Sequence, residues 1–267
     1  MNETPMRALS VLIGVALVCS ILVSVATISL TPFQERNALI ARYRHIVGLT
    51  GLAGSDASDE EVLEVAGRLD ARVVNLDTGE FVTDIPPEDV NSRVAAGDPD
   101  ASVVIPPEDD LAKLGRRASL EVIYLVWSEE TLNRVILPIN GRGMWSMLRG
   151  FIALEGDLDT IAAVTFYEQQ ETAGLGDQIE DAAWQAGWKG RRLFGQGGDV
   201  QFRVASGPVD PGSAAAAHEV DGMSGATLTG NSVTNLVRFW FGTHGYAQML
   251  ARWSEEPPTP ATPEAAK

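Results

Sequence analysis

The chain has 267 residues, and its 36 Asp and Glu residues against 20 Lys and Arg give a formal net charge of −16 at pH 7. This acidic balance argues against a nucleic-acid-binding protein, because phosphate backbones are bound by basic surfaces. The single cysteine excludes an intramolecular disulfide bond and any iron–sulfur cluster held by this chain alone. The length suits one membrane anchor and one domain with a sizeable core, or at most two small domains.

The three histidines do not form a recognisable metal-binding pattern. His45, His218 and His244 are far apart in the sequence, without the H-E-x-x-H or H-x₃-H spacing that places two imidazoles on one face of a helix. We therefore predict no protein-bound metal.

The first element is an apolar run over residues 8–30, which contains no charged residue. As a helix it would be about 35 Å long, enough to cross a hydrocarbon core of about 30 Å. A cleaved signal peptide is the alternative, with Arg7 as its basic region and Val25-Ala26-Thr27 as a small-residue cleavage site. The run is longer than the usual apolar region of a signal peptide, about 7–15 residues. We predict a retained transmembrane helix ending at Thr31-Pro32, within an anchor of residues 1–33.

The charges beside this span give a weak orientation signal. Arg7 precedes the span, whereas Arg36, Arg42 and Arg44 follow it. The positive-inside rule would therefore place the large domain in the cytoplasm.

The remaining chain is predicted to form one extramembrane domain, residues 34–254, and a Pro-rich disordered tail, residues 255–267. Its helices and strands alternate irregularly, which indicates an α+β fold. The expected elements are a helix at 34–46, a break at 48–54, a capping box at 58–61 followed by a short helix, a hairpin at 72–82, a short helix at 109–117, strands at 120–127, 134–139 and 160–167, a helix at 177–189 and a strand at 200–204.

The segment Asp221–Thr229 is rich in hydroxyl and small side chains and directly precedes an amphipathic helix. Thr229 or Asn231 is the expected N-cap of this helix. A helix N-terminus favours a phosphate group, because it presents unpaired N–H groups and the positive end of the helix dipole. The apolar face of the helix is predicted to consist of Val233, Leu236, Val237, Trp240 and Phe241.

Three interpretations of this segment are open. It can be a small-residue turn that only starts a helix. It can be a nucleophile elbow with Ser224 as nucleophile and His218 or His244 as base, although residues 213–219 do not have the pattern of the strand that an elbow requires. It can also be a covalent flavin site, because D-x-x-S-G-A-T at 221–227 looks like the motif in which FMN is joined through its phosphate to the last threonine, here Thr227.

Three further motifs favour the flavin interpretation. They are G-x-G-x-W-S at 141–146, F-Y-E-x-x-E-T-x-G-L-G at 166–176 and W-x₃-W-K-G at 184–190. In this order, and with the single N-terminal span, the chain closely resembles the C subunit (NqrC) of the sodium-translocating NADH:quinone reductase over residues 8–250. The related G subunit of the Rnf electron-transport complex shares E-T-x-G-L-G and S-G-A-T and is the alternative family.

The sequence departs from the NqrC pattern at three positions. Gln169 stands where that family has histidine, Ala173 where it has proline and Gly230 where it has serine. None of the three removes the acceptor threonine, but they put the shape of the flavin pocket in question.

The resemblance implies an FMN-binding domain with FMN joined by a phosphoester to Thr227, installed by a separate flavin transferase that uses FAD and Mg²⁺. It implies no catalytic residue in this chain, because the redox chemistry belongs to the flavin. Trp145 is a candidate for contact with the flavin ring. The other cofactor-binding residues that we expect are Thr172, Gly174, Leu175, Gly176, Ser224, Gly225, Ala226, Leu228 and Thr229.

The resemblance further implies an electron-transfer protein within a membrane complex of several chains, which passes electrons from NADH toward quinone and exports sodium. Its partners would be the other membrane subunits of that complex. The domain would face the periplasm from the bacterial inner membrane, and we prefer this orientation to the weak charge signal. Two other classes of function are a membrane-anchored serine hydrolase that uses Ser224 and an anchored binding domain without a cofactor.

Overall fold

The computed structural model describes residues 5–54 and 57–261 of the chain. The chain divides into two compact units, one up to Arg44 and the other from His45 onward. The first unit is helix α1 (Pro5–Thr50) up to Arg44. It contains the segment Leu12–Thr31, which is long and apolar enough to cross a membrane.

Helix α1 does not end at Thr31-Pro32, so that prediction was wrong. An interior proline removes one helical hydrogen bond and crowds the carbonyl four residues before it, but the buried residues Ile46, Val47 and Leu49 favour a helix that continues to the sheet. The helix ends instead at Thr50, and Gly51 follows with a φ of 72°. This left-handed conformation suits glycine and is a common way to stop a helix. The hydroxyl of Thr50 also donates to the Val47 carbonyl at 2.7 Å and accepts from the Leu52 N–H at 3.0 Å.

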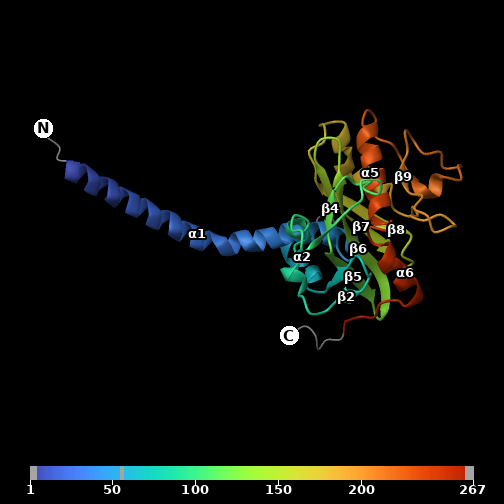
Figure 1. Cartoon of the computed structure of the whole chain (residues 1–267), viewed down its shortest axis with the longest axis horizontal. Helices are drawn as coiled ribbons and strands as arrows, with labels where there is room; N and C mark the ends of the chain where they lie inside the picture. The colour runs from blue at the N-terminus through green and yellow to red at the C-terminus, as the bar shows by residue number, and fades with distance from the viewer. Residues whose placement is uncertain (1–4, 55–56, 262–267) are drawn as a thin grey trace. The chain divides into compact units, whose positions relative to one another are not determined.

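The second unit is built on one antiparallel sheet, so the predicted mixed α+β fold is confirmed (Figure 1). Two small pairs accompany it, one antiparallel and one parallel. In spatial order the sheet consists of β2 (Phe81–Val82), β1 (Asp70–Asn75), β5 (Leu120–Ser128), β6 (Thr131–Arg142), β7 (Met147–Glu155) and β8 (Ile161–Glu168); the small pairs are β3 (Ser102–Val104) with β4 (Arg116–Ala118) and β9 (Arg203–Val204) with β10 (Glu219–Val220).

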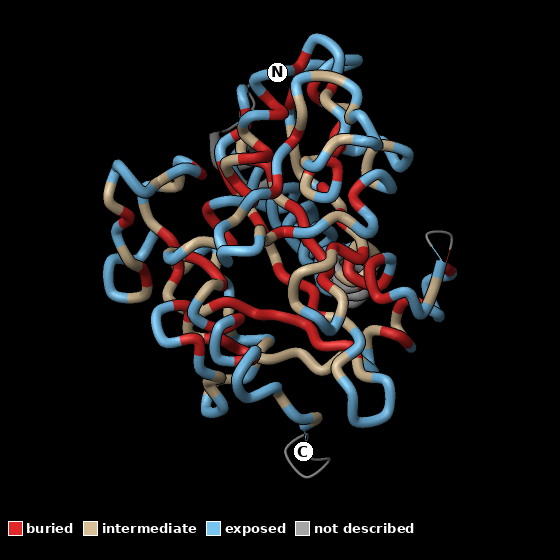
Figure 2. The backbone as a smooth tube through the Cα atoms, turned by 90° about the vertical axis from the view of Figure 1, so that its right-hand side faces the viewer, coloured by how far each residue is buried: buried red, intermediate tan, exposed pale blue. Residues whose placement is uncertain are grey.

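Both faces of this sheet are buried, which explains why its strands are almost continuously apolar. Ile123 and Leu125 of β5 belong to the main core, while Tyr124 between them is buried on the opposite face. An antiparallel sheet with one wet face would instead alternate apolar and polar residues. The buried positions follow the strands, and exposed positions gather in the connections (Figure 2).

Helix α5 (Thr227–Trp240) covers the first face. The five residues predicted for its apolar face are all buried, which confirms that prediction. The helix is also tied to β6 by hydrogen bonds: the Trp240 indole donates to the Asn140 carbonyl at 2.6 Å, and the Tyr246 hydroxyl after it donates to the Pro138 carbonyl at 2.7 Å. Helix α6 (Ala247–Glu255) follows α5 beside the sheet (Figure 1).

The second face is covered by the last turn of α1. The His45 ring stacks on Tyr167 with their centroids 5.2 Å apart, and Tyr167 stacks on Phe151 at 5.3 Å. Ile46, Val47 and neighbouring apolar residues are buried there. The end of α1 is therefore part of the core of the second unit, which starts at His45 and is called the extramembrane unit below.

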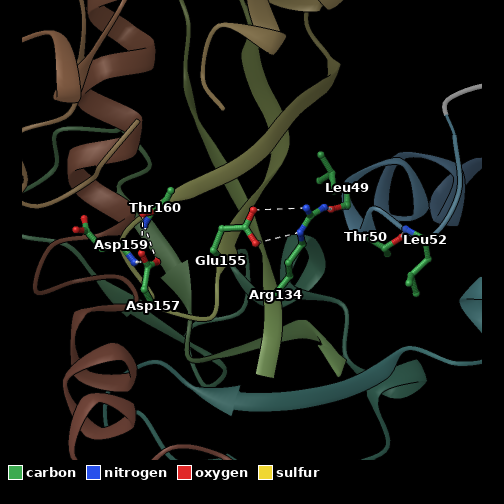
Figure 3. A network of polar contacts seen from close by, with 8 residues as sticks. All are labelled: Leu49, Thr50, Leu52, Arg134, Glu155, Asp157, Asp159 and Thr160. Atoms are coloured by element: carbon green, nitrogen blue, oxygen red, sulfur yellow. Dashed lines mark hydrogen bonds and ion pairs between the residues drawn. The ribbon is translucent and has the colours of Figure 1, made fainter. Parts of the chain in front are cut away.

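Arg134 of β6 fastens this end of α1 to the sheet. Its guanidinium donates to the Leu49 carbonyl at 2.9 Å and pairs with the Glu155 carboxylate at 3.4 Å, as Figure 3 shows. The Leu49 carbonyl is one of the last carbonyls of the helix, and these carbonyls have no partner within the helix itself.

Figure 3 also shows the turn between β7 and β8, in which the Asp157 carboxylate accepts from the Asp159 and Thr160 N–H groups.

Most predicted elements are confirmed. The capping box joins Ser58 and Glu61 in both directions and starts α2 (Asp59–Ala66). The β1–β2 hairpin and strands β5, β6 and β8 are also present where the sequence predicted them. The elements that we did not predict are β3, β4, β7 and β10, helix α6 and the short helices η1 (Pro87–Asp89), α3 (Ser92–Ala95) and η3 (Ala216–His218).

Two predicted helices were wrong. Residues 109–115 form turns and residues 116–117 belong to β4, because the Asp110 carboxylate accepts from the Leu114 and Gly115 N–H groups at 2.8 and 2.7 Å and holds a loop in which Lys113 has a φ of 53°. The helix expected at 177–189 is split into η2 (Gly176–Glu180) and α4 (Ala182–Ala186). Asp181 separates them, because its side chain accepts from Ala183 N–H and caps the second piece. The strand expected at 200–204 is reduced to β9.

The predicted tail begins inside α6, which includes Glu255. Residues 256–261 have no helix or strand, but the Thr259 carbonyl accepts a hydrogen bond from Arg72 of β1 at 2.6 Å. Residues 262–267 lie outside the described part of the chain.

The contacts of Arg134 predict a measurable loss of stability in Arg134→Met, which keeps the aliphatic stem. The Leu49 carbonyl and the Glu155 carboxylate would lose their shared partner, so we expect the free energy of unfolding of the extramembrane unit to fall by about 1–2 kcal/mol. Denaturant unfolding measures this. Arg68→Met is the matched control: its pair with Glu64 is exposed on both sides, so it should change the value by less than about 0.5 kcal/mol. Equal effects of the two substitutions would contradict the assignment.

Candidate functional site

Helix α5 begins earlier than the sequence indicated, and its N-terminus has no side-chain cap. Its first residue is Thr227, and Ala226 occupies the N-cap position, so the prediction of Thr229 or Asn231 as N-cap was wrong. Alanine has no side-chain acceptor, and the N–H groups of the first turn have no acceptor within the helix. Within the described part of the chain, the start of α5 therefore presents backbone N–H groups without a side-chain cap and the positive end of the helix dipole.

The hydroxyl groups near this helix start have different surroundings. Ser224 and Thr227 are exposed, whereas Thr229 is only 2% exposed. Gly225 has a φ of 74°, and a Cβ there would lie 2.8 Å from the Leu175 side chain. The positive φ favours glycine at this position, and the Leu175 side chain lies close to its backbone.

The turn between β6 and β7 forms a second part of the site. Gly143 donates to the Ser146 carbonyl at 2.7 Å, which closes a tight turn over residues 143–146. The turn leaves the Trp145 side chain 60% exposed. A large exposed aromatic at a well-defined turn is unusual, because its apolar surface would normally be buried.

The loop after β8 forms the third part, and Glu171 joins it to the other two. The Glu171 side chain is buried, and its carboxylate accepts from the Thr229 hydroxyl at 2.6 Å. The same carboxylate accepts from the backbone N–H groups of Trp145 at 3.1 Å and Met144 at 3.3 Å. One side chain therefore connects the β6–β7 turn, the loop after β8 and the first turn of α5.

Two more contacts complete this arrangement. The indole N–H of Trp145 donates to the Thr172 hydroxyl at 3.1 Å. The Gln178 amide donates to the Ser224 carbonyl at 3.5 Å, so η2 also touches the segment before α5. The three motifs, which are distant in sequence, thus meet at one place on the surface.

Each of the three parts of the site carries exposed apolar side chains. A flat aromatic ligand suits such a surface, because apolar and aromatic side chains remove its faces from water. A phosphate suits the neighbouring helix N-terminus. The exposed apolar residues are Met144 at 44%, Trp145 at 60%, Leu175 at 40% and Leu228 at 58%.

The structure brings together the residues that the sequence predicted for the cofactor. Thr172, Gly174, Leu175, Ser224, Gly225, Thr227 and Leu228 are exposed, as is Trp145; Gly176, Ala226 and Thr229 are buried. The buried Gly176 has a backbone role, because a Cβ there would lie 2.7 Å from the Thr229 hydroxyl.

Sequence reasoning missed Glu171 and Met144 as members of this group. Glu171 stands within the F-Y-E-x-x-E-T motif, but a glutamate in a polar loop is usually solvated, and only the three-dimensional structure shows its donors. Gln169, one of the departures from the NqrC pattern, supports this loop: its side-chain oxygen accepts from the Glu171 N–H at 2.5 Å.

The geometry does not support a nucleophile elbow. The residues just before Ser224 are not in a strand that leads into it, because β10 ends at Val220. Among the described residues, neither candidate base bonds to Ser224: His218 contacts the Arg192 carbonyl at 3.0 Å, and His244 contacts the Asp109 carboxylate at 3.1 Å. A base within hydrogen-bonding reach of the serine is the minimum that this chemistry requires.

Comparison with known proteins gives the family. A family model described as "FMN-binding domain" matches residues 143–242, a range that contains all three parts of the site. The C subunit of the Na⁺-translocating NADH-quinone reductase from Pseudomonas aeruginosa is 40% identical over 251 residues, which are 94% of this chain and 96% of that protein. The chain belongs to the NqrC family of this oxidoreductase complex. The same protein from Vibrio alginolyticus is 38% identical over 252 residues, 94% of this chain and 96% of that protein.

Solved structures agree with this family. The crystal structure of NqrC from Shewanella oneidensis superposes with a TM-score of 0.75 at 32% identity, covering 84% of this chain and 99% of that one. The corresponding protein from Parabacteroides distasonis, at 24% identity, shares the fold with a TM-score of 0.60 and covers 83% of this chain and 96% of that one. The NqrC relatives decide against the G subunit of the Rnf complex, which the sequence had left as the alternative family.

The close contacts before Ser224 predict that Gly222→Ala is destabilising. An added Cβ would lie 2.3 Å from the Ala205 carbonyl oxygen and 2.8 Å from the Gly207 nitrogen, and neither backbone atom can move cheaply. We expect a loss of about 1–3 kcal/mol in the free energy of unfolding, measured with denaturant. Gly207→Ala, where an added Cβ meets nothing within 4 Å, is the control and should change little. An unchanged midpoint for Gly222→Ala would show that this segment is not tightly held.

Proposed function

We propose that this chain is an electron-transfer subunit of the membrane-bound Na⁺-translocating NADH-quinone reductase and carries FMN joined to Thr227 by a phosphoester. One observation carries the assignment of Thr227. Thr227 is an exposed residue at the start of a helix that has no side-chain cap, in a site that also carries the exposed side chains of Trp145, Leu175 and Leu228. An acceptor hydroxyl, free N–H donors for a phosphate and apolar surface for a ring are the three features that a phosphate-linked flavin needs.

Each group has a distinct task in this proposal. The N–H groups of the first turn of α5 would bind the phosphate oxygens, and the helix dipole would stabilise their negative charge. Trp145, Leu175 and Leu228 would remove apolar ring surface from water. Gly225 allows the turn before α5, because its φ of 74° is a left-handed conformation that suits glycine. When bound, FMN supplies the one-electron chemistry that passes electrons from NADH toward quinone.

The attachment step would be a phosphoryl transfer to Thr227. Its Oγ1 would form a bond to the phosphorus of the FMN half of FAD, the bond from that phosphorus to the AMP oxygen would break, and AMP would be the leaving group. The hydroxyl proton passes to a base of the transferase or to water. Residues that bind the phosphate after this step need no catalytic role of their own, so we assign none to this chain.

We further propose that the apolar segment Leu12–Thr31 is retained as a membrane anchor and that the extramembrane unit faces the periplasm. The retained anchor is supported by the length of the apolar run, which exceeds that of a signal peptide. The other membrane subunits of the complex would be the partners of this chain, and a flavin transferase would be needed for its maturation.

The attachment predicts a definite mass change when the full chain is made together with a flavin transferase. The intact mass should rise by FMN minus one water, and the added mass should lie on Thr227 within the tryptic peptide Val204–Arg238. Thr227→Ala should remove the added mass completely.

Ser224→Ala is the matched control, because Ser224 is an exposed hydroxyl three residues before Thr227. It should keep the flavin. Added mass that stays in Thr227→Ala would place the attachment elsewhere, and an unmodified wild-type chain in cells that flavinylate a related protein would contradict covalent FMN altogether.

The orientation is tested with an introduced cysteine in the exposed loop before β4, Glu108→Cys, in a Cys19→Ser background. A membrane-impermeant thiol reagent should label it from the periplasmic side of intact inner membranes and should leave it unlabelled in inside-out vesicles. The reverse pattern would place the domain in the cytoplasm, as the arginine count suggests.

A further inference from the structure

We propose that Glu171 is a positioning residue: its buried carboxylate holds the parts of the flavin site in their binding arrangement before any cofactor arrives. This inference rests on the proposed function, since it concerns the same site. It assigns a role to a residue that contributes neither the acceptor oxygen nor exposed apolar surface.

The argument begins with the donors around Glu171. Its Oε1 accepts from the Trp145 N–H, and its Oε2 accepts from both the Met144 N–H and the Thr229 hydroxyl. Both side-chain oxygens are thus in use, and each faces at least one backbone donor. A glutamine has one oxygen and an NH₂ group, so it could satisfy only one of the two backbone N–H groups and would oppose the other with a donor.

The surrounding backbone is adapted to this carboxylate. An added Cβ at Gly143 would lie 2.5 Å from Oε1, and one at Gly176 would lie 2.8 Å from the Glu171 Cβ and 2.7 Å from the Thr229 hydroxyl. Both glycines have ordinary negative-φ or extended backbone, because neither is among the residues with positive φ. Glycine is suited to these two positions because it has no Cβ, which allows the two chain segments to pack closely around the Glu171 side chain.

The bond to Thr229 has a consequence for α5. Thr229 is the third residue of the helix, and its hydroxyl is committed to Glu171 at 2.6 Å. As the third residue of the helix, Thr229 is not at the N-cap, the position from which a side chain accepts from the N–H groups of the first turn. The same contact therefore fixes the helix start against the loop after β8, while Ala226 at the N-cap offers the first turn no side-chain acceptor.

The bonds to the β6–β7 turn fix the second part of the site. Glu171 accepts from the backbone N–H of Trp145, and Thr172, which follows Glu171 in the chain, accepts from the Trp145 indole N–H. These two bonds orient the ring, while most of its surface stays exposed. An ordered exposed ring loses less conformational freedom on binding than a mobile one, which favours binding and attachment.

The test compares Glu171→Gln with Glu168→Gln in the full chain, prepared in detergent without a transferase. Glu168 is on the same segment three residues earlier, but its carboxylate is partly exposed and pairs with Arg93 and Arg149. Hydrogen exchange is measured at the Met144 and Trp145 amides and, as an internal reference, at the core amides of β6 and β7. We expect exchange about tenfold faster at Met144 and Trp145 in Glu171→Gln, with unchanged core protection, and no change in Glu168→Gln.

The second readout is the initial rate of flavin attachment by a transferase, which should fall about tenfold in Glu171→Gln and remain normal in Glu168→Gln. Unchanged exchange at Met144 and Trp145 would overturn the positioning role. Faster exchange with a normal attachment rate would also overturn it, because the arrangement would then not serve the cofactor. If the wild-type chain is never flavinylated, the proposed function fails. The exchange rates of the cofactor-free chain then still show whether Glu171 orders the Met144 and Trp145 amides.

A milder pair keeps the test decisive if Glu171→Gln does not fold. Thr229→Val removes one donor and preserves the side-chain shape, whereas Thr229→Ser keeps the hydroxyl. We expect slower attachment in Thr229→Val and recovery of the rate in Thr229→Ser. Equal rates in both would contradict a role for the Glu171–Thr229 bond.

Discussion

The packing of α5 on β6 is the constraint on which the rest of the site depends. Val233, Leu236 and Val237 are completely buried against the sheet, and hydrogen bonds from Trp240 and Tyr246 reach carbonyls of β6. A helix fixed in this way along its length has a fixed N-terminus. The turn at the end of β6 is close to that helix, since an added Cβ at Gly141 would lie 3.2 Å from Leu236. The sheet therefore determines where the hydroxyl-rich start of α5 lies.

The second buried face has a different role. The last turn of α1 packs there through His45 and Ile46 and is fastened by Arg134, so the extramembrane unit includes the end of the helix that carries the apolar span. This continuity also explains why the expected boundary at Pro32 was misleading. A proline signals a helix end through the loss of one hydrogen bond, but the buried contacts of residues 45–50 favour a helix that extends to the sheet.

The elements that sequence reasoning found are those with a strong local signal. The capping box at Ser58, the Asp77-Thr78-Gly79 turn and the apolar period of α5 each involve residues close together in the sequence. Strand β7 was missed although it is central, because its pattern Met-Leu-Arg-Gly-Phe-Ile-Ala-Leu-Glu includes Arg149 and Gly150, which weaken a strand prediction. Its tertiary neighbours β6 and β8 decide its conformation.

The site shows the same division. Motifs indicated which segments belong together, and the exposed Thr227 lies where that reasoning expected an accessible hydroxyl. The N-cap was mispredicted because Thr229 has the residue type of a cap, while its actual partner, Glu171, is 58 positions away. Such a pairing depends on how the loop after β8 packs against α5, so it cannot be predicted from the residues near Thr229 in the sequence.

The burial of Thr229 has a chemical consequence for the hydroxyl-rich segment at the start of α5. Thr227 and Thr229 have the same functional group and the same side chain, so their intrinsic reactivity as alcohols is equal. One is exposed and the other is enclosed, with its proton already donated to a carboxylate. An electrophile arriving from solvent can therefore reach the Thr227 hydroxyl but not the Thr229 hydroxyl. The fold thus determines the regiochemistry of attack between two chemically identical alcohols.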